Sequence, residues 1–140
     1  QTNLVFETGR LETWLNELAK RNVLGRVFIL VGVSPLKSLR MARHLRDEVP
    51  GVFVPDEVMR RMERADEMGG AAEEGLQIAL ELIEKIRPLQ GVNGFHITAS
   101  GWEEIVPRLV REAGLEPEDA SGIGHEAGVP LPVGPASSEG

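Results

Sequence analysis

The chain has 140 residues and a formal net charge of −7, with 41% hydrophobic and 26% charged residues. This length and composition predict one globular domain. Because the sequence contains no cysteine, disulfide scaffolds, thiolate metal sites and cysteine nucleophiles are excluded. No apolar run approaches the roughly 20 residues that cross a bilayer, so we predict no membrane span. Since no signal peptide opens the chain, we expect a cytoplasmic protein.

The negative charge is concentrated near the C-terminus. Residues 1 to 113 carry 15 basic and 17 acidic side chains, whereas residues 114 to 140 carry five acidic and no basic ones. A nearly neutral body argues against a nucleic-acid partner, because proteins that bind phosphate backbones usually have a strongly positive surface. Gly, Pro and Ser dominate the last residues, so we predict a disordered acidic tail over 117 to 140.

The first part of the chain predicts two strands separated by a helix. A short apolar run over residues 3 to 7 predicts a strand, and apolar residues at helical spacing predict a helix over 10 to 21. The run RVFILVGV at 26 to 33 has no polar alternation, which is typical of a strand buried on both faces of a parallel sheet. The chain begins at Gln1 without a methionine, so we expect it to be part of a longer polypeptide.

Three helices are predicted next. Ser34 is a suitable N-cap for the first of them and Pro35 suits its first turn, with a stop near Pro50. Pro55 precedes a second helix, and the clearest apolar stripe of the chain predicts the third over residues 72 to 87.

The chain then returns to a strand and a final helix. NGFHIT at 93 to 98 predicts the strand, and the spacing of Ser100 and Glu103 predicts a capping box for the helix. Pro107 falls inside this helical pattern, so it is expected to kink the helix or mark its true first turn.

The order of elements predicts an α/β fold with parallel strands. Three parallel strands would leave two long apolar edges open. We therefore interpret residues 1 to 116 as the C-terminal three βα units of a (β/α)8 TIM barrel, with a small open three-layer sheet as the alternative.

In a barrel, functional residues gather at the carboxyl ends of the strands, and these ends carry Glu7, the turn at Ser34, and Thr98. Glu7 is either a general base or ligand contact, or a partner of a helix dipole. His96 is more readily explained as a hydrogen-bonded core residue than as a catalyst. No two histidines have the spacing of metal ligands, so no metal site is predicted.

Four ordered segments resemble the methylenetetrahydrofolate reductase family. They are QTNLVFE, ILVGVSPLKSLRMA, the pair VPDEVMRRM and EEGLQIALELIEKI, and GVNGFHIT, which together cover about residues 1 to 113. The chain looks most like the short, single-domain prokaryotic reductases. The resemblance implies an oxidoreductase that reduces 5,10-methylenetetrahydrofolate, or a related pterin, to the 5-methyl form. It implies FAD as the cofactor and NAD(P)H or another electron donor.

The same resemblance implies which residues contact the substrate. By position, the family's folate-contacting residues fall at Asn3, Met41, Leu45 and Trp102, where Asn3 keeps an amide and the other three differ in chemistry from the family's residues. The catalytic glutamate and most flavin ligands are expected upstream of Gln1, so the chain alone is expected to be inactive.

Two other interpretations remain open on the sequence. One is a different TIM-barrel enzyme of pterin or one-carbon metabolism, such as a methyltransferase. Another is a half-barrel without catalytic activity that binds a partner chain. As an enzyme, the full-length protein is expected to be a homo-oligomer or to work with a partner subunit.

Overall fold

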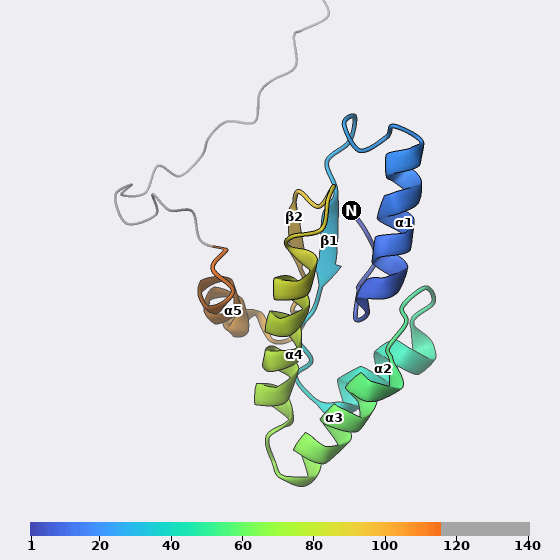
Figure 1. Ribbon diagram of the computed structural model, residues 1–140. Coiled ribbons are helices and arrows are strands. Elements are labelled where there is room, and N and C mark those ends of the chain that lie inside the picture. Colours follow the sequence, from blue (N-terminus) through green and yellow to red (C-terminus); the bar gives the residue numbers. More distant parts are fainter. Residues whose placement is uncertain (116–140) are drawn as a thin grey trace, which may run out of the picture.

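The computed structural model describes residues 1 to 115 (Figure 1). The elements of this part are, in chain order, α1 (Thr8–Lys20), β1 (Leu30–Val33), α2 (Leu39–Glu48), α3 (Asp56–Glu67), α4 (Ala71–Ile86), β2 (Gly94–Ile97), the 3₁₀ turn η1 (Glu103–Ile105) and α5 (Val106–Glu112). None of the described helices is long and apolar enough to cross a membrane. The tail predicted over 117 to 140, and residue 116, lie outside the described residues.

The strands form a small parallel sheet, as the sequence predicted. β1 and β2 pair in parallel from Leu30 opposite Gly94 to Val33 opposite Ile97. The predicted first strand is reduced to one parallel bridge, between Leu4 and Gly32. Three parallel segments therefore lie side by side with β1 in the middle, and the protein has an α/β fold.

The first segment is short because it carries a bulge. The Thr2 N–H donates to the Leu30 carbonyl, and the Val5 N–H donates to the Gly32 carbonyl, each at 2.9 Å. The two donors are three residues apart but their acceptors are only two apart, so one extra residue is accommodated between them. The Leu4 N–H, which this arrangement would otherwise leave unpaired, donates to Asn3 Oδ1 at 2.9 Å. A ladder interrupted in this way ends after a single bridge.

β1 is also shorter than the predicted strand over 26 to 33. Its ladder begins where β2 begins, and just before it the Ile29 N–H donates to Asn93 Oδ1 at 2.7 Å. Val31 and Val33 are fully buried, whereas Phe28 is 84% exposed and Leu30 is 38% exposed. The prediction of burial on both faces is therefore wrong for alternate residues, because no layer of the described chain covers the second face.

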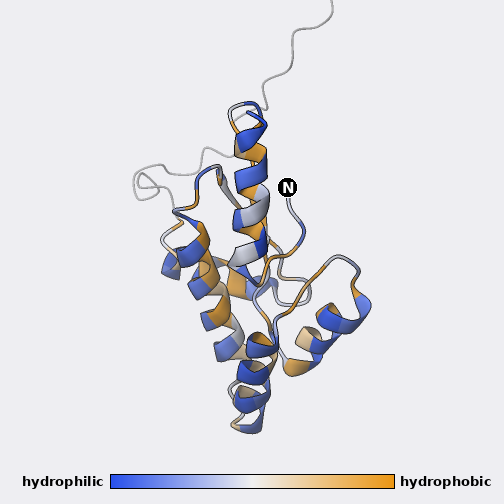
Figure 2. Ribbon diagram, turned by 45° about the vertical axis from the view of Figure 1, so that its right-hand side comes forward, coloured by the Kyte–Doolittle hydropathy of each residue, from blue (hydrophilic) through white to orange (hydrophobic). Residues whose placement is uncertain are grey.

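Helix α4 crosses the covered face of the sheet and contributes more buried core residues than any other described element (Figure 1). Of its predicted apolar stripe, Leu76, Ala79, Ile83 and Ile86 are buried and Leu80 is half-buried. A leucine or isoleucine side chain contributes about 1.5–3 kcal/mol when fully buried. Figure 2 shows that hydrophilic residues predominate along α2 and α3. The sheet is thus held from one side by an amphipathic helical layer.

The helix predicted to start at Ser34 starts later. Ser38 is its N-cap and accepts from the Met41 N–H at 3.1 Å, so α2 begins at Leu39. Ser34, Pro35 and Leu36 are instead buried in the connection between β1 and α2. α4 approaches this connection so closely that a Cβ added at Gly75 would lie 1.7 Å from the Leu36 carbonyl oxygen. Tertiary packing therefore overrides the local capping signal.

The capping box predicted from Ser100 and Glu103 is wrong as well. The Glu103 carboxylate accepts from the Gly101 N–H at 3.0 Å, and the residue before η1 is Trp102, which makes no side-chain cap. Gly101 has a φ of +75°, which turns the chain away from the geometry that a capping box requires. Pro107 lies in the first turn of α5, one of the two predicted outcomes.

An ion-pair network joins α3 to α4. Arg61 Nε donates to Glu74 at 2.7 Å, and the same guanidinium donates to the Glu81 carboxylate. The hydrogen bond from Arg61 lowers the pKa of the Glu81 carboxyl below its ordinary value of 4.5, although burial of the group acts in the opposite direction.

We expect this network to make the protein sensitive to acid. Because the Glu81 pKa is lower in the folded chain than in the unfolded one, its contribution to stability is complete above pH 4.5 and is lost as the pH falls through the lowered value. An Arg61→Met variant should therefore show a smaller decline in the free energy of unfolding between about pH 5 and about pH 3. Urea unfolding followed by circular dichroism measures this decline. Arg60→Met, at an exposed neighbouring position, is the matched control, and equal slopes for both variants would contradict the assignment.

Candidate functional site

The carboxyl ends of the three parallel segments meet at one edge of the sheet, which we call the C-terminal edge. They carry Glu7, Ser34 and Thr98, and the Thr98 N–H continues the ladder by donating to the Val33 carbonyl at 3.0 Å. Parallel α/β proteins place their functional groups at this edge, because the connections that follow the strands are free to vary there.

Ser34 is unusual at this edge. It is 2% exposed, and its Oγ is the buried side-chain atom without a hydrogen-bond partner among the described residues. An unpaired buried hydroxyl costs about 1–3 kcal/mol. The sequence predicted that this hydroxyl caps α2, but the side chain of Ser38 caps that helix instead.

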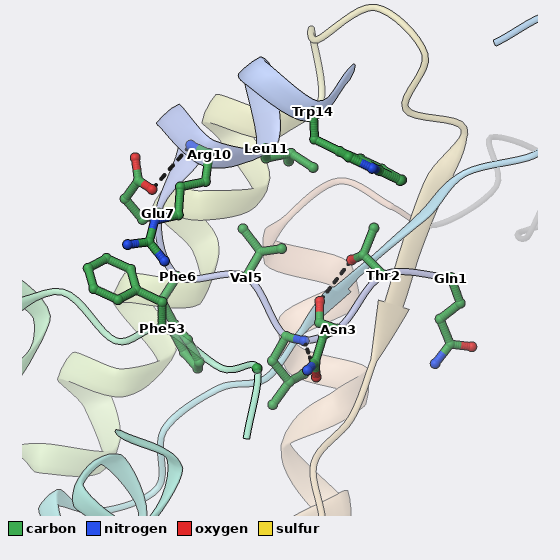
Figure 3. Close-up of a pocket in the computed structure, with 12 residues that line it drawn as sticks. Gln1, Thr2, Asn3, Val5, Phe6, Glu7, Arg10, Leu11, Trp14 and Phe53 are labelled. Carbon is green, nitrogen blue, oxygen red and sulfur yellow. Dashed lines mark hydrogen bonds between the residues drawn. The ribbon is translucent and has the colours of Figure 1, made fainter. Parts of the chain in front are cut away.

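A groove runs along the free side of residues 1 to 7, between this segment and α1 (Figure 3). We call it the edge groove; its volume is about 460 Å³. Its wall includes Trp14, which is 44% exposed, and Phe53, whose ring lies 3.8 Å below the Arg10 guanidinium carbon. This cation–π contact ties the segment between α2 and α3 to the start of α1.

Of the four residues that the resemblance assigns to the substrate, Asn3 lines the edge groove (Figure 3). Its side-chain oxygen accepts from the Leu4 N–H, so the amide nitrogen is the part left to face a ligand. That nitrogen lies 2.9 Å from the position that a Cβ would take at Gly51, which has a φ of +81°. Any side chain at Gly51 would collide with the Asn3 amide.

The structure does not bring the other three residues into the edge groove. Leu45 is 7% exposed and packs in the core, and Met41 is half-buried on the same helix, α2. Trp102 is half-buried at the C-terminal edge, between β2 and η1, and packs against the core. Their predicted contacts with a folate remain predictions.

Glu7 acts here as the partner of a helix N-terminus. Its carboxylate accepts from the N–H groups of Gly9 and Arg10, the latter at 3.2 Å, and so caps α1. Both oxygens are thereby engaged, which favours the structural alternative for this residue over a general base.

The histidines have ordinary surface environments in this part of the chain. His96 is exposed on β2 opposite Gly32, so the interpretation as a core residue is wrong. The reason is again the uncovered second face of the sheet. His44 Nδ1 lies 2.9 Å from the Glu48 carboxylate on an exposed face of α2. Among residues 1 to 115, no cluster of three His, Asp or Glu side chains could hold a metal ion.

The N-termini of α1, α2, α3 and α4 do not fit the diphosphate of a dinucleotide. The N-termini of α1 and α2 are occupied by the side chains of Glu7 and Ser38. Those of α3 and α4 carry acidic residues in their first turns, which would repel a phosphate. A flavin dinucleotide would therefore take its phosphate contacts from residues other than these.

Sequence reasoning missed a contact that joins two loops of the C-terminal edge. Lys37 Nζ donates to the Gly101 carbonyl at 3.3 Å, while Glu103 accepts from the Gly101 N–H. Hydrogen bonds from the backbone N–H groups of Glu103 itself and of Gly101, with a smaller effect of the Lys37 charge, lower the pKa of the Glu103 carboxyl. Lys37 and Gly101 are 64 residues apart, so no local pattern could have revealed the contact.

Comparison with known families supports the resemblance. A search among curated individual proteins gives no match. The family model described as methylenetetrahydrofolate reductase matches residues 1–114, which is most of the chain and nearly all of its described part. The matched range begins with the bulged first segment and ends after α5, so it includes every helix and strand described above. The chain therefore belongs to the methylenetetrahydrofolate reductase family.

Proposed function

We propose that the chain forms part of the folate-binding wall of a flavin-dependent reductase that converts 5,10-methylenetetrahydrofolate, or a closely related pterin, to its 5-methyl form. Family membership supports the chemistry. In this proposal the chain supplies the C-terminal three βα units of a TIM barrel, and the reaction takes place in the cytoplasm. The units are residues 1 to 7 with α1, β1 with α2 to α4, and β2 with α5.

The observation that carries the proposal is that both outer edges of the parallel sheet are open and apolar. On one side lies the edge groove. On the other, a second groove of about 440 Å³ follows β2. Apolar residues such as Phe95, Ile97 and Val110 line it, together with Arg87 and Asn93. Phe28 and Leu30 are exposed on the sheet face between them. The edge strands of an open parallel sheet have unpaired backbone groups and exposed apolar side chains, which further strands would cover. In a closed barrel, both edges are paired with neighbouring strands.

The further strands belong either to the same polypeptide or to a partner subunit. The open edges are equally compatible with both arrangements. They are therefore also compatible with the half-barrel interpretation. Mass measurement of the isolated chain in solution distinguishes these cases: a closed, folded assembly of this chain alone would support the half-barrel without catalytic activity.

Within the assembled barrel, the residues of this chain bind and orient the folate. The Asn3 amide nitrogen offers a hydrogen bond from the edge groove, and Trp102 offers an aromatic surface at the C-terminal edge. Bound FAD would supply the hydride-transfer chemistry between the folate and NAD(P)H or another electron donor. Because the N-termini of α1 to α4 do not fit its diphosphate, we expect the isolated chain to bind FAD weakly or not at all.

We expect an Asn3→Gln substitution to alter folate affinity and to leave flavin content unchanged. The longer side chain moves the amide by one methylene and cannot keep both its bond to the Leu4 N–H and its present position in the edge groove. One altered hydrogen bond corresponds to about 1 kcal/mol, or roughly a fivefold change in Kd. The test is titration of 5-methyltetrahydrofolate into the assembled enzyme, with flavin absorbance recorded in parallel.

Asn16→Gln makes the same chemical change on the exposed surface of α1, outside the edge groove, and is the matched control. If Asn3→Gln and Asn16→Gln bind the folate equally well, Asn3 is not part of the site. If flavin content falls together with folate affinity, the edge groove belongs to the flavin instead.

A further inference from the structure

The peptide groups on either side of Gly101 are each held by a charged side chain. Lys37 Nζ donates to the Gly101 carbonyl at 3.3 Å, and the Glu103 carboxylate accepts from the Gly101 N–H at 3.0 Å. The carbonyl that Lys37 holds belongs to the peptide bond that joins Gly101 to Trp102. The orientation of this peptide therefore determines where the Trp102 side chain leaves the backbone.

Lys37 extends from a rigid base. The three residues before it, Ser34, Pro35 and Leu36, are buried. The residue after it, Ser38, caps α2. The backbone on both sides of Lys37 is thus fixed. Its hydrogen bond to the Gly101 carbonyl therefore restrains the loop after β2 relative to the β1–α2 connection.

The loop after β2 needs such a restraint. Gly101 is exposed, has a φ of +75°, and an added Cβ there would meet nothing within 4 Å, so packing does not hold this residue. The Trp102 N–H donates to the Ala99 carbonyl at 2.9 Å, which closes the turn but does not tie it to a neighbouring element. Among the hydrogen bonds of the described residues, that of Lys37 links this turn to the β1–α2 connection.

We propose that Lys37 and Glu103 are positioning residues, which fix the two peptide groups on either side of Gly101 so that Trp102 is held as a substrate-binding side chain at the C-terminal edge. The part of this inference that concerns substrate rests on the proposed function. The part that concerns the position of Trp102 is independent of the proposed function and can be measured on this chain alone.

The first measurement labels the two tryptophans, Trp14 and Trp102, with 5-fluorotryptophan and records their ¹⁹F NMR resonances, assigned through Trp14→Phe. Lys37→Met should shift or broaden the Trp102 resonance and leave that of Trp14 unchanged. Lys37→Arg keeps a charged donor and should restore the original resonance. Glu103→Ala should act like Lys37→Met, and Glu103→Gln, which keeps an acceptor oxygen, should restore it in part. Lys20→Met, at the far end of α1, is the matched control.

The second measurement uses the assembled enzyme. Lys37→Met should raise the KM for methylenetetrahydrofolate roughly fivefold, the effect of one lost hydrogen bond, with kcat nearly unchanged, and Lys37→Arg should restore KM.

An unchanged Trp102 resonance in Lys37→Met overturns the positioning role. A shifted resonance with an unchanged KM leaves the contact in place but removes Trp102 from the substrate site. A wild-type enzyme that does not reduce methylenetetrahydrofolate overturns the proposed function, whatever the resonance shows.

Discussion

Replacing Gly75 with alanine is expected to lower the free energy of unfolding by about 3 kcal/mol, the upper end of the usual range for an overpacked core. An added Cβ would lie 1.7 Å from the Leu36 carbonyl oxygen and 2.6 Å from the carbonyl carbon. These are backbone atoms of a buried connection, so they cannot move aside as the end of a flexible side chain would. Urea unfolding followed by circular dichroism measures the loss.

The expected loss of stability is informative, because glycine usually destabilises the interior of a helix relative to alanine. Alanine is favoured over glycine in a helix interior by about 1 kcal/mol, so helix propensity alone predicts that Gly75→Ala is stabilising. Gly25→Ala is the control, since an added Cβ at Gly25 meets nothing within 4 Å. Equal stability of Gly75→Ala and the wild type would mean that α4 does not approach the β1–α2 connection as closely as described.

Replacing Gly32 with alanine is expected to displace the first segment and to weaken folate binding in the assembled enzyme roughly tenfold, which corresponds to about 1.4 kcal/mol. The added Cβ would lie 2.9 Å from the Asn3 carbonyl oxygen and 3.0 Å from that of Thr2. The segment is held by few hydrogen bonds to β1, so it should move rather than β1, and Asn3 would move with it. Titration with 5-methyltetrahydrofolate and urea unfolding report the two effects.

Gly94→Ala provides the comparison on the neighbouring strand. Its added Cβ would lie 3.2 Å from the end of the flexible Leu30 side chain, which can adjust. We expect near wild-type behaviour there. If Gly94→Ala and Gly32→Ala weaken folate binding to the same extent, the close approach of the first segment to Gly32 has no role in the site.

The sequence predicted the elements whose signals are local and strong. The helix expected over 72 to 87 is observed as Ala71–Ile86, and the strand expected over 93 to 98 as Gly94–Ile97. Both have dense, regular apolar patterns, and such patterns fix the buried face before any tertiary contact is made. The parallel α/β arrangement followed from the alternation of these elements.

The errors arose where distant parts of the chain decide local structure. The Ser34–Pro35 signal for a helix start is genuine, but this segment is buried against α4 near Gly75, and the helix starts only at Leu39. The bulge at Asn3 depends on hydrogen bonds to a strand about 30 residues away. Propensity and capping rules carry no information about either contact, so sequence periodicity alone could not have found them.

The candidate site was predicted only in part, for a related reason. Asn3 was assigned by position in an ordered set of motifs, and the structure places it in a groove, where its amide nitrogen is available. The contact of Lys37 with Gly101 and the stacking of Arg10 on Phe53 join segments that are far apart in the sequence. Such pairs become visible only when the connections between elements have been placed in space.

The bulge in the first segment has a consequence for the pattern of its side chains. In a regular strand, side chains alternate between the two faces of the sheet, so the face of one residue determines the face of all the others. One inserted residue interrupts this alternation. The polar residues before it, Thr2 and Asn3, and the apolar residues after it, Val5 and Phe6, therefore do not follow one continuous alternation. A single strand can thus serve a polar surface at one end and a hydrophobic core at the other.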